Sequence, residues 1–530
     1  MHRTGVHISP PDTRLIDALM APAAFEHPVT SVDLIETHIS WVILTNDTVY
    51  KIKKPLVLDF LDFGDLERRR FFCEEEIRLN RPWAPEIYID VVPITLENDR
   101  PRFGGAGMPI EYAVRMHRFD QSLRLDQQLE HDKLTVLDMK ELGQAIATRH
   151  AAAPAANPRQ RKHLLAINIE FMRDNFAALE GFIDNDVLAS LSAWNERELD
   201  NVHGLLGRRF DDGFVRDCHG DLHLANLVRL PSGITTFDCI EFNSDLRTID
   251  VICDIAFLVM DLVARQRHDL AAHFLNRYLE QSGDYAGVAL PDLYFVYRCL
   301  VRAKVAAIRS EEEDSDADRQ ADLVEAHRYC DMALKQISKP TPVLIIMSGL
   351  SGSGKTRVSG ELMAAMPAIR VRSGIERKRM FGLDETEDSA SDIDKGIYTP
   401  ATSRKVYSHL IETACSILRF HHNVILDAAF LHADECERAI RAARECGFPT
   451  VIVRVEAPIE VLRERIRRRA QASSDASEAD VAVLEHQLAS AEPLPARTEE
   501  HVIVCDNSGD VDVAALKKKI RRHADATHGP

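Results

Sequence analysis

The sequence predicts an α+β domain, built from a β-rich lobe and a helical lobe, followed by an α/β domain with a parallel sheet. Three observations predict this fold class: strand-like segments occupy residues 38–118, helical patterns dominate residues 122–337, and apolar strands alternate with helical stretches beyond residue 342. A chain of 530 residues is also too long for one ordinary hydrophobic core, so two or three domains are expected.

The β-rich lobe is predicted from segments of strand composition that are separated by turn residues, such as Asn46 and Asp47. Residues 66–81 have a helix-forming composition and apolar residues at helical spacing, so one helix is expected to interrupt the strands. The strand segments are 38–54, 86–98 and 110–119.

A domain boundary is expected near residues 338–342, where a helical pattern gives way to a proline-marked link and then to an apolar strand. We therefore divide the chain into domains 1–338 and 339–530. The second domain should contain a parallel sheet, because helical stretches separate its strands. Its strand segments are 343–349, 423–430, 450–458 and 501–506.

Composition and charge narrow the class of protein. Hydrophobic residues make up 45% and charged residues 28%, as in folded domains. The net charge of -18 argues against nucleic acid or an anionic membrane surface as the main partner. The cysteines form no C-x-x-C pair, the N-terminus lacks the apolar core of a signal peptide, and aspartates interrupt the most apolar segment, 249–264. We therefore expect a cytoplasmic protein with reduced thiols.

The run GLSGSGKT at 349–356 matches G-x-x-x-x-G-K-[ST] between an apolar strand and a helical stretch, which is the context of a phosphate-binding loop. Glycines let backbone N–H groups turn toward phosphates, Lys355 reaches the outer phosphates, and Thr356 is a candidate magnesium ligand. A glycine-rich turn without a ligand is the alternative. The expected nucleotide-binding residues are Gly349, Ser351, Gly352, Ser353, Gly354, Lys355 and Thr356.

Two further features accompany this loop. Asp427 ends an apolar strand, where an acid would hold magnesium or its water, although an aspartate there is also a common start of a loop. The segment 462–488 begins with a run rich in arginine. It is either a lid that closes over phosphates or a basic, solvated helix.

Through this loop and its context, residues 341–508 resemble small P-loop kinases of the AAA_33 and zeta-toxin-like type. In that group a Ser-Asp pair after the second strand supplies an acid that positions or deprotonates the acceptor hydroxyl. This chain has Gly374 in place of that acid, and glycine cannot accept a proton. The resemblance therefore implies nucleotide binding, whereas phosphoryl transfer by this domain would need another acid, such as Glu376 or Asp384.

The run HGDLHLAN at 219–226 has three interpretations. A zinc site would use His219 and His223, but Gly220 disfavours the helix that would align them, and no third ligand stands at a diagnostic spacing. An ordinary polar turn does not explain why an apolar strand and another aspartate follow so closely. The third interpretation, phosphoryl transfer, explains more of the pattern.

Phosphoryl transfer needs an acid that accepts the proton of the attacking hydroxyl, and oxygen ligands that hold magnesium against the nucleotide phosphates. The run reads H-x-D-x-x-x-x-N, in which Asp221 would be the acid and Asn226 a magnesium ligand. Asp238, which follows the strand segment 233–237, would be the second magnesium ligand.

At these residues the chain resembles the aminoglycoside phosphotransferase and choline kinase branch of the protein-kinase-like fold. The resemblance covers residues 30–335 and is strongest over 217–258. It implies that an aspartate after the metal ligand supports the catalytic loop. Asp254 fits this role, with Asp250 as the alternative.

The same resemblance implies a lysine in the β-rich lobe that contacts the ATP phosphates. Lys51 and Lys53 lie on one face of their strand because strand side chains alternate. Lys51 is the first choice, and Lys53 is a further nucleotide contact. The partner carboxylate should come from the following helix, where Glu75 is preferred among Glu74, Glu75 and Glu76.

These features predict an ATP- and Mg2+-dependent phosphotransferase that acts on a hydroxyl of a small molecule at the N-terminal domain. The P-loop domain would bind a second nucleotide and regulate or assist. Two alternatives stay open: the P-loop domain is the active kinase and the N-terminal domain selects the substrate, or the chain is a non-enzymatic nucleotide sensor. No sequence motif identifies the acceptor or an oligomeric state.

Overall fold

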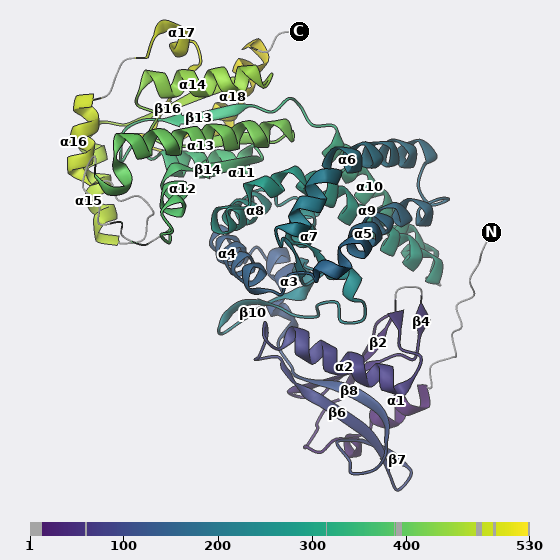
Figure 1. Cartoon of the computed structure of the whole chain (residues 1–530). Coiled ribbons are helices and arrows are strands. Elements are labelled where there is room, and N and C mark those ends of the chain that lie inside the picture. Colours follow the sequence, from purple (N-terminus) through teal and green to yellow (C-terminus); the bar gives the residue numbers. More distant parts are fainter. Residues whose placement is uncertain are drawn as a thin grey trace. The chain divides into compact units, whose positions relative to one another are not determined.

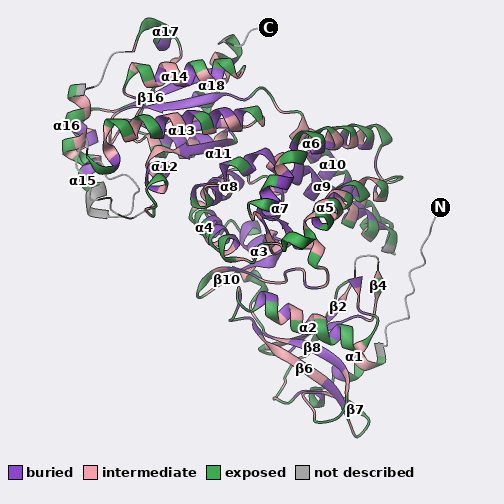
Figure 2. Cartoon of the chain, viewed as in Figure 1, coloured by how far each residue is buried: buried purple, intermediate pink, exposed green. Residues whose placement is uncertain are grey.

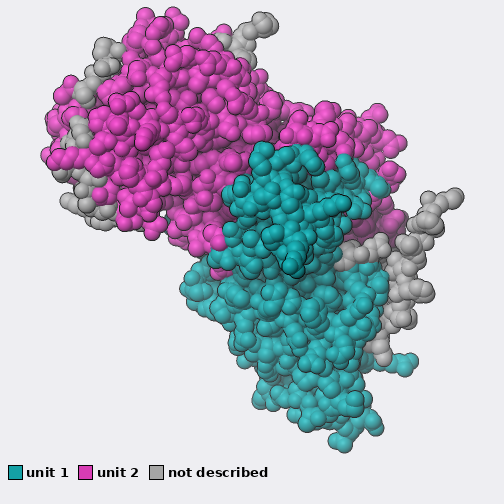
Figure 3. Space-filling model, in the orientation of Figure 1, with its two compact units in different colours: residues 1–138, 152–177, 203–261 teal, residues 139–151, 178–202, 262–530 magenta. Residues whose placement is uncertain are grey.

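The computed structural model describes residues 13–58, 61–313, 315–385, 387, 389, 395–472, 480–490 and 494–527. The chain forms two compact units, which Figure 3 shows in two colours. The first unit contains residues 1–138, 152–177 and 203–261, and the second contains residues 139–151, 178–202 and 262–530.

An antiparallel six-stranded sheet forms the first part of the first unit, with the strand order β1-β2-β3-β8-β6-β7. Figure 1 labels β2, β6, β7 and β8 of this sheet. The strands predicted at 38–54, 86–98 and 110–119 are confirmed, and the first of them is a hairpin of β2 and β3. The bounds are β1 Asp33–Glu36, β2 Ser40–Leu44, β3 Thr48–Lys53, β6 Tyr88–Glu97, β7 Arg100–Phe103 and β8 Pro109–His117, with a small separate pair β4 Val57–Leu58 and β5 Leu61–Asp62.

Helix α2 (Leu66–Asn80) packs on β8 and β6 and covers one face of this sheet. Asp65 caps the helix, because its carboxylate accepts a hydrogen bond from the Arg68 backbone N–H. On β3, Tyr50 belongs to the apolar core on the face away from α2. Since side chains alternate along a strand, Lys51 and Lys53 point to the α2 side.

Short strands frame the loop that follows residue 217. Strand β9 (Val215–Asp217) pairs with β12 (Thr248–Asp250), and β10 (Leu227–Leu230) forms a hairpin with β11 (Gly233–Thr236). Helix α7 (Val251–Ala264) starts directly after β12. The other helices that precede α7 are α1 Thr13–Leu19, α3 Leu125–Glu130, α4 Val136–Ala152, α5 Arg161–Ala178 and α6 Asn185–Asp211. Residues 139–151 of α4 and 185–202 of α6 belong to the second unit.

The second unit contains a parallel five-stranded sheet with the order β14-β15-β13-β16-β17. All residues of β13 are buried, and Figure 2 shows β16 as largely buried, because helices cover both faces of a parallel sheet. The bounds are β13 Leu344–Ser348, β14 Ala368–Arg372, β15 Asn423–Asp427, β16 Thr450–Glu456 and β17 Val502–Asp506.

The helices of the second unit include α9 and α10, which pack on each other before the parallel sheet begins. Within the described residues, none of the helices combines the length and the apolarity needed to cross a membrane. The bounds are α8 His268–Ser282, α9 Pro291–Glu312, α10 Asp316–Ile337, α11 Lys355–Ala365, α12 Ser373–Met380, α13 Pro400–Arg419, α14 Ala433–Glu445, α15 Ile459–Ala472, α16 Val481–Ser490, α17 Ala496–Glu499 and α18 Val513–Thr527.

The predicted fold class is confirmed, since a β-rich lobe and a helical region precede an α/β domain whose sheet is parallel. The division of the chain at residues 338 and 339 stays a prediction. The compact unit that holds the parallel sheet also contains the helices from residue 262 onward.

Candidate active sites

Lys51 and Lys53 on β3 share one carboxylate partner on α2. Lys51 Nζ lies 2.9 Å from Glu76 Oε1, and Lys53 Nζ lies 2.8 Å from Glu76 Oε2. Glu75, the partner expected from the sequence, instead forms an ion pair with Arg78 at 2.7 Å. The carboxylate partner of Lys51 is therefore Glu76 and not the expected Glu75. Consecutive helix residues point about 100° apart, and Glu76 is the one that faces β3.

Glu76 is fully buried, so its charge depends on these two lysines. Burial disfavours the carboxylate, but Lys51 and Lys53 outweigh burial and hold the pKa of Glu76 well below its usual range. Burial also opposes the charge of Lys51, but nearby carboxylates, Asp238 first among them, raise the pKa of Lys51. A charged lysine is thus fixed at the position where nucleotide phosphates are expected to bind.

Two carboxylates of the segment after β11, Asp238 and Glu241, contact the same lysines. Lys51 Nζ lies 2.5 Å from Asp238 Oδ1, and Lys53 forms an ion pair with Glu241. Asp238 has a φ of 60°, and its N–H donates to the Tyr88 hydroxyl at 3.0 Å, which fixes the turn that directs its carboxylate toward β3. No local motif marks Glu241, because only the fold brings it to Lys53.

Asp254 holds the backbone of the 219–226 loop. The N–H groups of His219 and Gly220 donate to its two carboxylate oxygens at 3.2 and 2.8 Å. Asp250, the alternative, is buried in an ion pair with Arg209 at 2.6 Å. The structure therefore brings Asp254, rather than Asp250, to the loop.

Asn226 and Asp221 are in direct contact within this loop. Asn226 Nδ2 donates to both the backbone oxygen and the Oδ2 of Asp221, each at 3.0 Å. The side chain of Asp221 is 38% exposed, so its carboxylate is accessible to a substrate, whereas Asn226 is buried.

The two histidines of the loop act as internal hydrogen-bond partners. His219 Nε2 lies 3.0 Å from Phe237 O, and its Nδ1 accepts a hydrogen bond from Asp221 N. His223 Nδ1 accepts from Ala225 N, and its Nε2 lies 3.3 Å from Asp221 Oδ2. Because both ring nitrogens of each histidine have partners, the geometry disfavours the zinc interpretation.

The donor set near Asp221 suits magnesium. Asn226 Oδ1 and Asp238 Oδ2 take part in no hydrogen bond within the part of the chain that the structure describes. Amide and carboxylate oxygens are the hard donors that Mg2+ prefers. Asn226 and Asp238 are therefore the residues that would hold this ion.

A second candidate site lies in the second unit, in the loop between β13 and α11. Gly349, Gly352 and Gly354 have φ values of 142°, 81° and 91°, which glycine adopts without strain. A Cβ on Gly349 would lie 2.5 Å from Val455 O. Lys355 Nζ donates to Gly349 O at 2.8 Å. The loop thus has the backbone shape of a phosphate cradle.

Residues distant in sequence support this loop. The N–H of Ser351 donates to Gln487 Oε1 at 2.8 Å, and Asn507 Nδ2 donates to Ser353 O at 2.6 Å. The buried hydroxyl of Ser353 has no hydrogen-bond partner among the described residues. Gln487 and Asn507 were not expected at this loop, because no local motif marks them.

The arginines at the start of α15 differ in their contacts. Arg465 reaches the P-loop, where it donates to Ser353 O at 3.4 Å. Arg463 and Arg468 form ion pairs with glutamates at the surface. The side chain of Arg469 lies outside the described residues. Arg465 thus contacts the loop, as a lid would require, while Arg463 and Arg468 fit a solvated helix.

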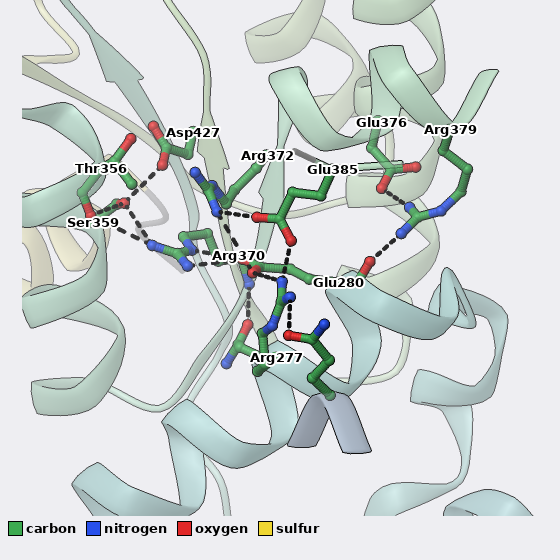
Figure 4. Close-up of polar contacts among 12 residues, drawn as sticks. Arg277, Glu280, Thr356, Ser359, Arg370, Arg372, Glu376, Arg379, Glu385 and Asp427 are labelled. Carbon is green, nitrogen blue, oxygen red and sulfur yellow. Dashed lines mark hydrogen bonds and ion pairs between the residues drawn. The ribbon is translucent and has the colours of Figure 1, made fainter. Parts of the chain in front are cut away.

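Thr356 and Asp427 lie close to each other at the start of α11 and the end of β15 (Figure 4). Asp427 Oδ2 accepts a hydrogen bond from Ser359 Oγ at 3.0 Å. Within the described residues, Thr356 Oγ1 and Asp427 Oδ1 have no hydrogen-bond partner. A hydroxyl and a carboxylate oxygen suit Mg2+, so these two residues would hold the ion at the P-loop.

Gly374 lies in the first turn of α12, where the resemblance to P-loop kinases expects an acid. Glu376, one of the two replacements considered, is buried and forms ion pairs with Arg379 and with His409 Nε2, the latter at 3.1 Å. Asp384, the other replacement, is exposed on the loop after α12. The contacts of Glu376 are thus those of a structural ion pair.

Comparison with known proteins gives one family match. Residues 344–494 match the AAA_33 family, described as an AAA domain, which confirms the expected resemblance of the C-terminal part to P-loop kinases. Curated relatives from Mycobacterium bovis and Mycobacterium tuberculosis, both called uncharacterized proteins, are 28% identical over 458 residues. The match covers 85% of this chain and 89% of each relative.

Solved structures resemble each part of the chain. A choline/ethanolamine kinase family protein from Mesorhizobium loti is 12% identical, with 62% of this chain and 95% of that chain covered and a TM-score of 0.38. A gluconokinase from Sinorhizobium meliloti is 18% identical, with 36% of this chain and 98% of that chain covered and a TM-score of 0.26. The AAA_33 match includes the P-loop at 349–356.

Proposed function

We propose that this chain is an ATP- and Mg2+-dependent phosphotransferase that transfers a phosphoryl group to a hydroxyl of a small molecule at the first unit. The observation that carries the proposal is the set of contacts around Lys51. Glu76 and Asp238 bind this lysine, and Asn226 orients the partly exposed Asp221 within the same compact unit.

Each of these side chains has a separate task in the reaction. Asp221 takes the proton of the hydroxyl that attacks the γ-phosphoryl group. Asn226 orients the Asp221 carboxylate through its amide. Lys51 stays charged because carboxylates surround it, and it binds the nucleotide phosphates. When bound at Asn226 and Asp238, Mg2+ neutralises the charge that develops on the phosphate oxygens.

The P-loop of the second unit binds a second nucleotide in a regulatory or assisting role. The glycine conformations of the loop and the oxygen donors of Thr356 and Asp427 support nucleotide binding. Gly374 and the internal ion pairs of Glu376 weigh against acceptor chemistry in this domain. A kinase reaction in the P-loop domain is therefore the less favoured function.

The test measures ATP turnover by phosphorus NMR in the presence of a pooled library of amino sugars, sugars, amino alcohols and nucleosides. Wild type is compared with Asp221→Asn and Lys355→Ala. We expect a phosphorylated product that is lost with Asp221→Asn and retained, at a changed rate, with Lys355→Ala. Loss of the product with Lys355→Ala alone would move the chemistry to the P-loop domain. Nucleotide binding without any product would favour a nucleotide sensor.

A further inference from the structure

Helix α8 contributes one of its faces to the domain that holds the parallel sheet. Ala272, Asn276 and Glu280 stand four residues apart, so they lie along the same side of the helix. Ala272 belongs to the hydrophobic core of the sheet, together with Val343 and Ile345. Helix α8 thus packs as a helix of the P-loop domain, although it precedes the proline-marked link in the sequence.

The side chain of Asn276 forms hydrogen bonds with outward-facing backbone groups of β14, which is an edge strand of the sheet. Its Nδ2 donates to Ala368 O at 3.0 Å, and its Oδ1 accepts from Arg370 N at 2.6 Å. One amide side chain therefore makes the two hydrogen bonds that a neighbouring strand would make at this edge. This contact fixes the position of α8 along β14.

From Glu280, polar contacts continue to the candidate magnesium ligands of the P-loop (Figure 4). Glu280 Oε1 accepts from Arg370 Nη2 at 2.8 Å and from Nε at 3.2 Å. Arg370 Nη1 donates to Thr356 O and to Ser359 Oγ, both at 3.4 Å. Ser359 Oγ donates in turn to Asp427 Oδ2. Arg370 thus joins α8 to both Thr356 and Asp427.

The charge of Arg370 needs a counter-charge at this depth. Arg370 is 7% exposed and Glu280 is 4% exposed. Burial opposes the charge of Glu280, but Arg370 and Arg372 outweigh burial and lower the pKa of Glu280. Without Glu280, the charge of Arg370 would be left unbalanced in a buried position on the Asp427 side of the sheet. An unbalanced positive charge there opposes the binding of a divalent cation.

We infer that Glu280 is a positioning residue of the magnesium and nucleotide site at the P-loop. Glu280 neutralises Arg370 and holds its guanidinium against the first turn of α11, so that Ser359 and Asp427 keep their arrangement for the cation. The inference rests on the proposed nucleotide binding at the P-loop. It adds that a helix from the N-terminal part of the sequence completes this site.

The experiment measures ATP affinity with and without Mg2+ by titration calorimetry, using the full chain. All proteins carry Asp238→Asn, which removes a metal ligand of the first unit and leaves the P-loop as the Mg2+-dependent site. Glu280→Gln is compared with Glu385→Gln, a matched control whose carboxylate contacts Arg372 and Arg277 rather than Arg370.

We expect Glu280→Gln to weaken ATP binding in Mg2+ on the order of tenfold and not to weaken Mg2+-free binding, because the unbalanced charge of Arg370 repels the cation but not the anionic nucleotide. Glu385→Gln should change neither affinity. A second change, Arg370→Gln, removes the unbalanced charge and should restore most of the Mg2+-dependent affinity in the Glu280→Gln protein. This recovery is a readout that a purely structural role would not produce.

An unchanged Mg2+ dependence in Glu280→Gln would overturn the inference. Equal losses with and without Mg2+, together with a lower unfolding temperature and no recovery by Arg370→Gln, would assign Glu280 to the fold alone and would also overturn it. If Glu280→Gln does not fold, Glu280→Asp keeps the charge and should retain the Mg2+ dependence. Failure of the nucleotide site is seen separately, as ATP binding that Lys355→Ala leaves unchanged.

Discussion

The side-chain amide of Asn226 donates a hydrogen bond to the carboxylate of Asp221 at 3.0 Å. This bond holds the Asp221 carboxylate in one orientation while part of it stays open to solvent. It also uses the Asn226 nitrogen and leaves the amide oxygen for another ligand. One short loop therefore offers both a carboxylate that can accept a proton and an amide oxygen that can bind a cation.

Replacing Asp221, the proposed proton acceptor, should stop turnover without harming the fold. We expect Asp221→Asn to lower kcat by about 100- to 10,000-fold, because the amide cannot accept the hydroxyl proton. The unfolding temperature should stay unchanged, since the two side chains are nearly isosteric. Steady-state rates and thermal unfolding check both points, with Asp200→Asn on the exposed side of α6 as the matched control. Wild-type turnover in Asp221→Asn would exclude Asp221 as the proton acceptor.

Two neighbouring glutamates on α2 should differ sharply on substitution. Glu76→Gln removes the buried partner of Lys51 and Lys53 and should lower the free energy of unfolding by about 3 to 5 kcal/mol, with a loss of ATP affinity. Glu75→Gln breaks an ion pair with the exposed Arg78 and should cost less than about 1 kcal/mol. Urea unfolding and ATP titration measure these effects. Similar losses in both variants would contradict the assignment of Glu76.

The backbone of the 219–226 loop should not tolerate a larger residue at Gly220. This residue has a φ of 83°, and a Cβ would lie 3.0 Å from Leu246 O. We expect Gly220→Ala to lower the free energy of unfolding by about 1 to 3 kcal/mol and to reduce turnover. As a control of opposite sign, Gly204→Ala in the exposed middle of α6 should stabilise the protein by about 0.5 to 1 kcal/mol. If both substitutions changed the free energy of unfolding in the same direction, the strained backbone assigned to Gly220 would be refuted.

The stability of the P-loop domain should fall as pH rises through the titration of Glu435. Burial, with a further contribution from Asp434, raises the pKa of Glu435 to about 7 from its ordinary value of 4.5. Between these values the folded state binds this proton more tightly than the unfolded chain does, so the free energy of unfolding decreases with increasing pH. We expect Glu435→Gln to remove about 1 to 3 kcal/mol of that decrease.

Urea unfolding of wild type and Glu435→Gln near pH 5 and near pH 8 tests this expectation. The difference between the two proteins isolates Glu435 from the other groups that titrate in this range. Parallel pH profiles for the two proteins would mean that Glu435 keeps the same protonation state throughout.

The proposed pair of nucleotide sites predicts the stoichiometry of ATP binding. Calorimetric titration in Mg2+ should give about two nucleotides per wild-type chain and about one in either Lys355→Ala or Asp238→Asn, because each variant disables one site. A single nucleotide in wild type that disappears with one of these substitutions would reduce the proposal to that site.

The parts of the site that the sequence predicted best lie within one short segment. Asp221 and Asn226 are five residues apart, so local chain geometry sets their relation and their spacing was informative. The choice among the glutamates of α2 depends on how that helix is rotated on the sheet, which is a tertiary property. Glu241 meets Lys53 across 188 residues, and nothing in its local sequence marks this contact.

In the second domain, too, local patterns were predictable from the sequence and tertiary contacts were not. Periodicity predicted four of the five strands of its parallel sheet and the alternation with helices, because both are local patterns, whereas the edge strand β14 was not among the expected segments. The docking of α8 on β14 depends on Asn276 and Glu280, whose partners lie 92 and 90 residues further along the chain. Such pairings need the fold, and a single sequence contains no signal for them.

The amide of Asn276 has a practical meaning for shortened versions of this protein. A fragment that starts at residue 339 lacks α8, so Ala368 O and Arg370 N lose their hydrogen bonds to Asn276. The apolar core that Ala272 contacts also becomes exposed to solvent. Bare strand edges pair with one another between copies, so this fragment should aggregate. A fragment that starts near residue 262 keeps its edge closed and is the one to express.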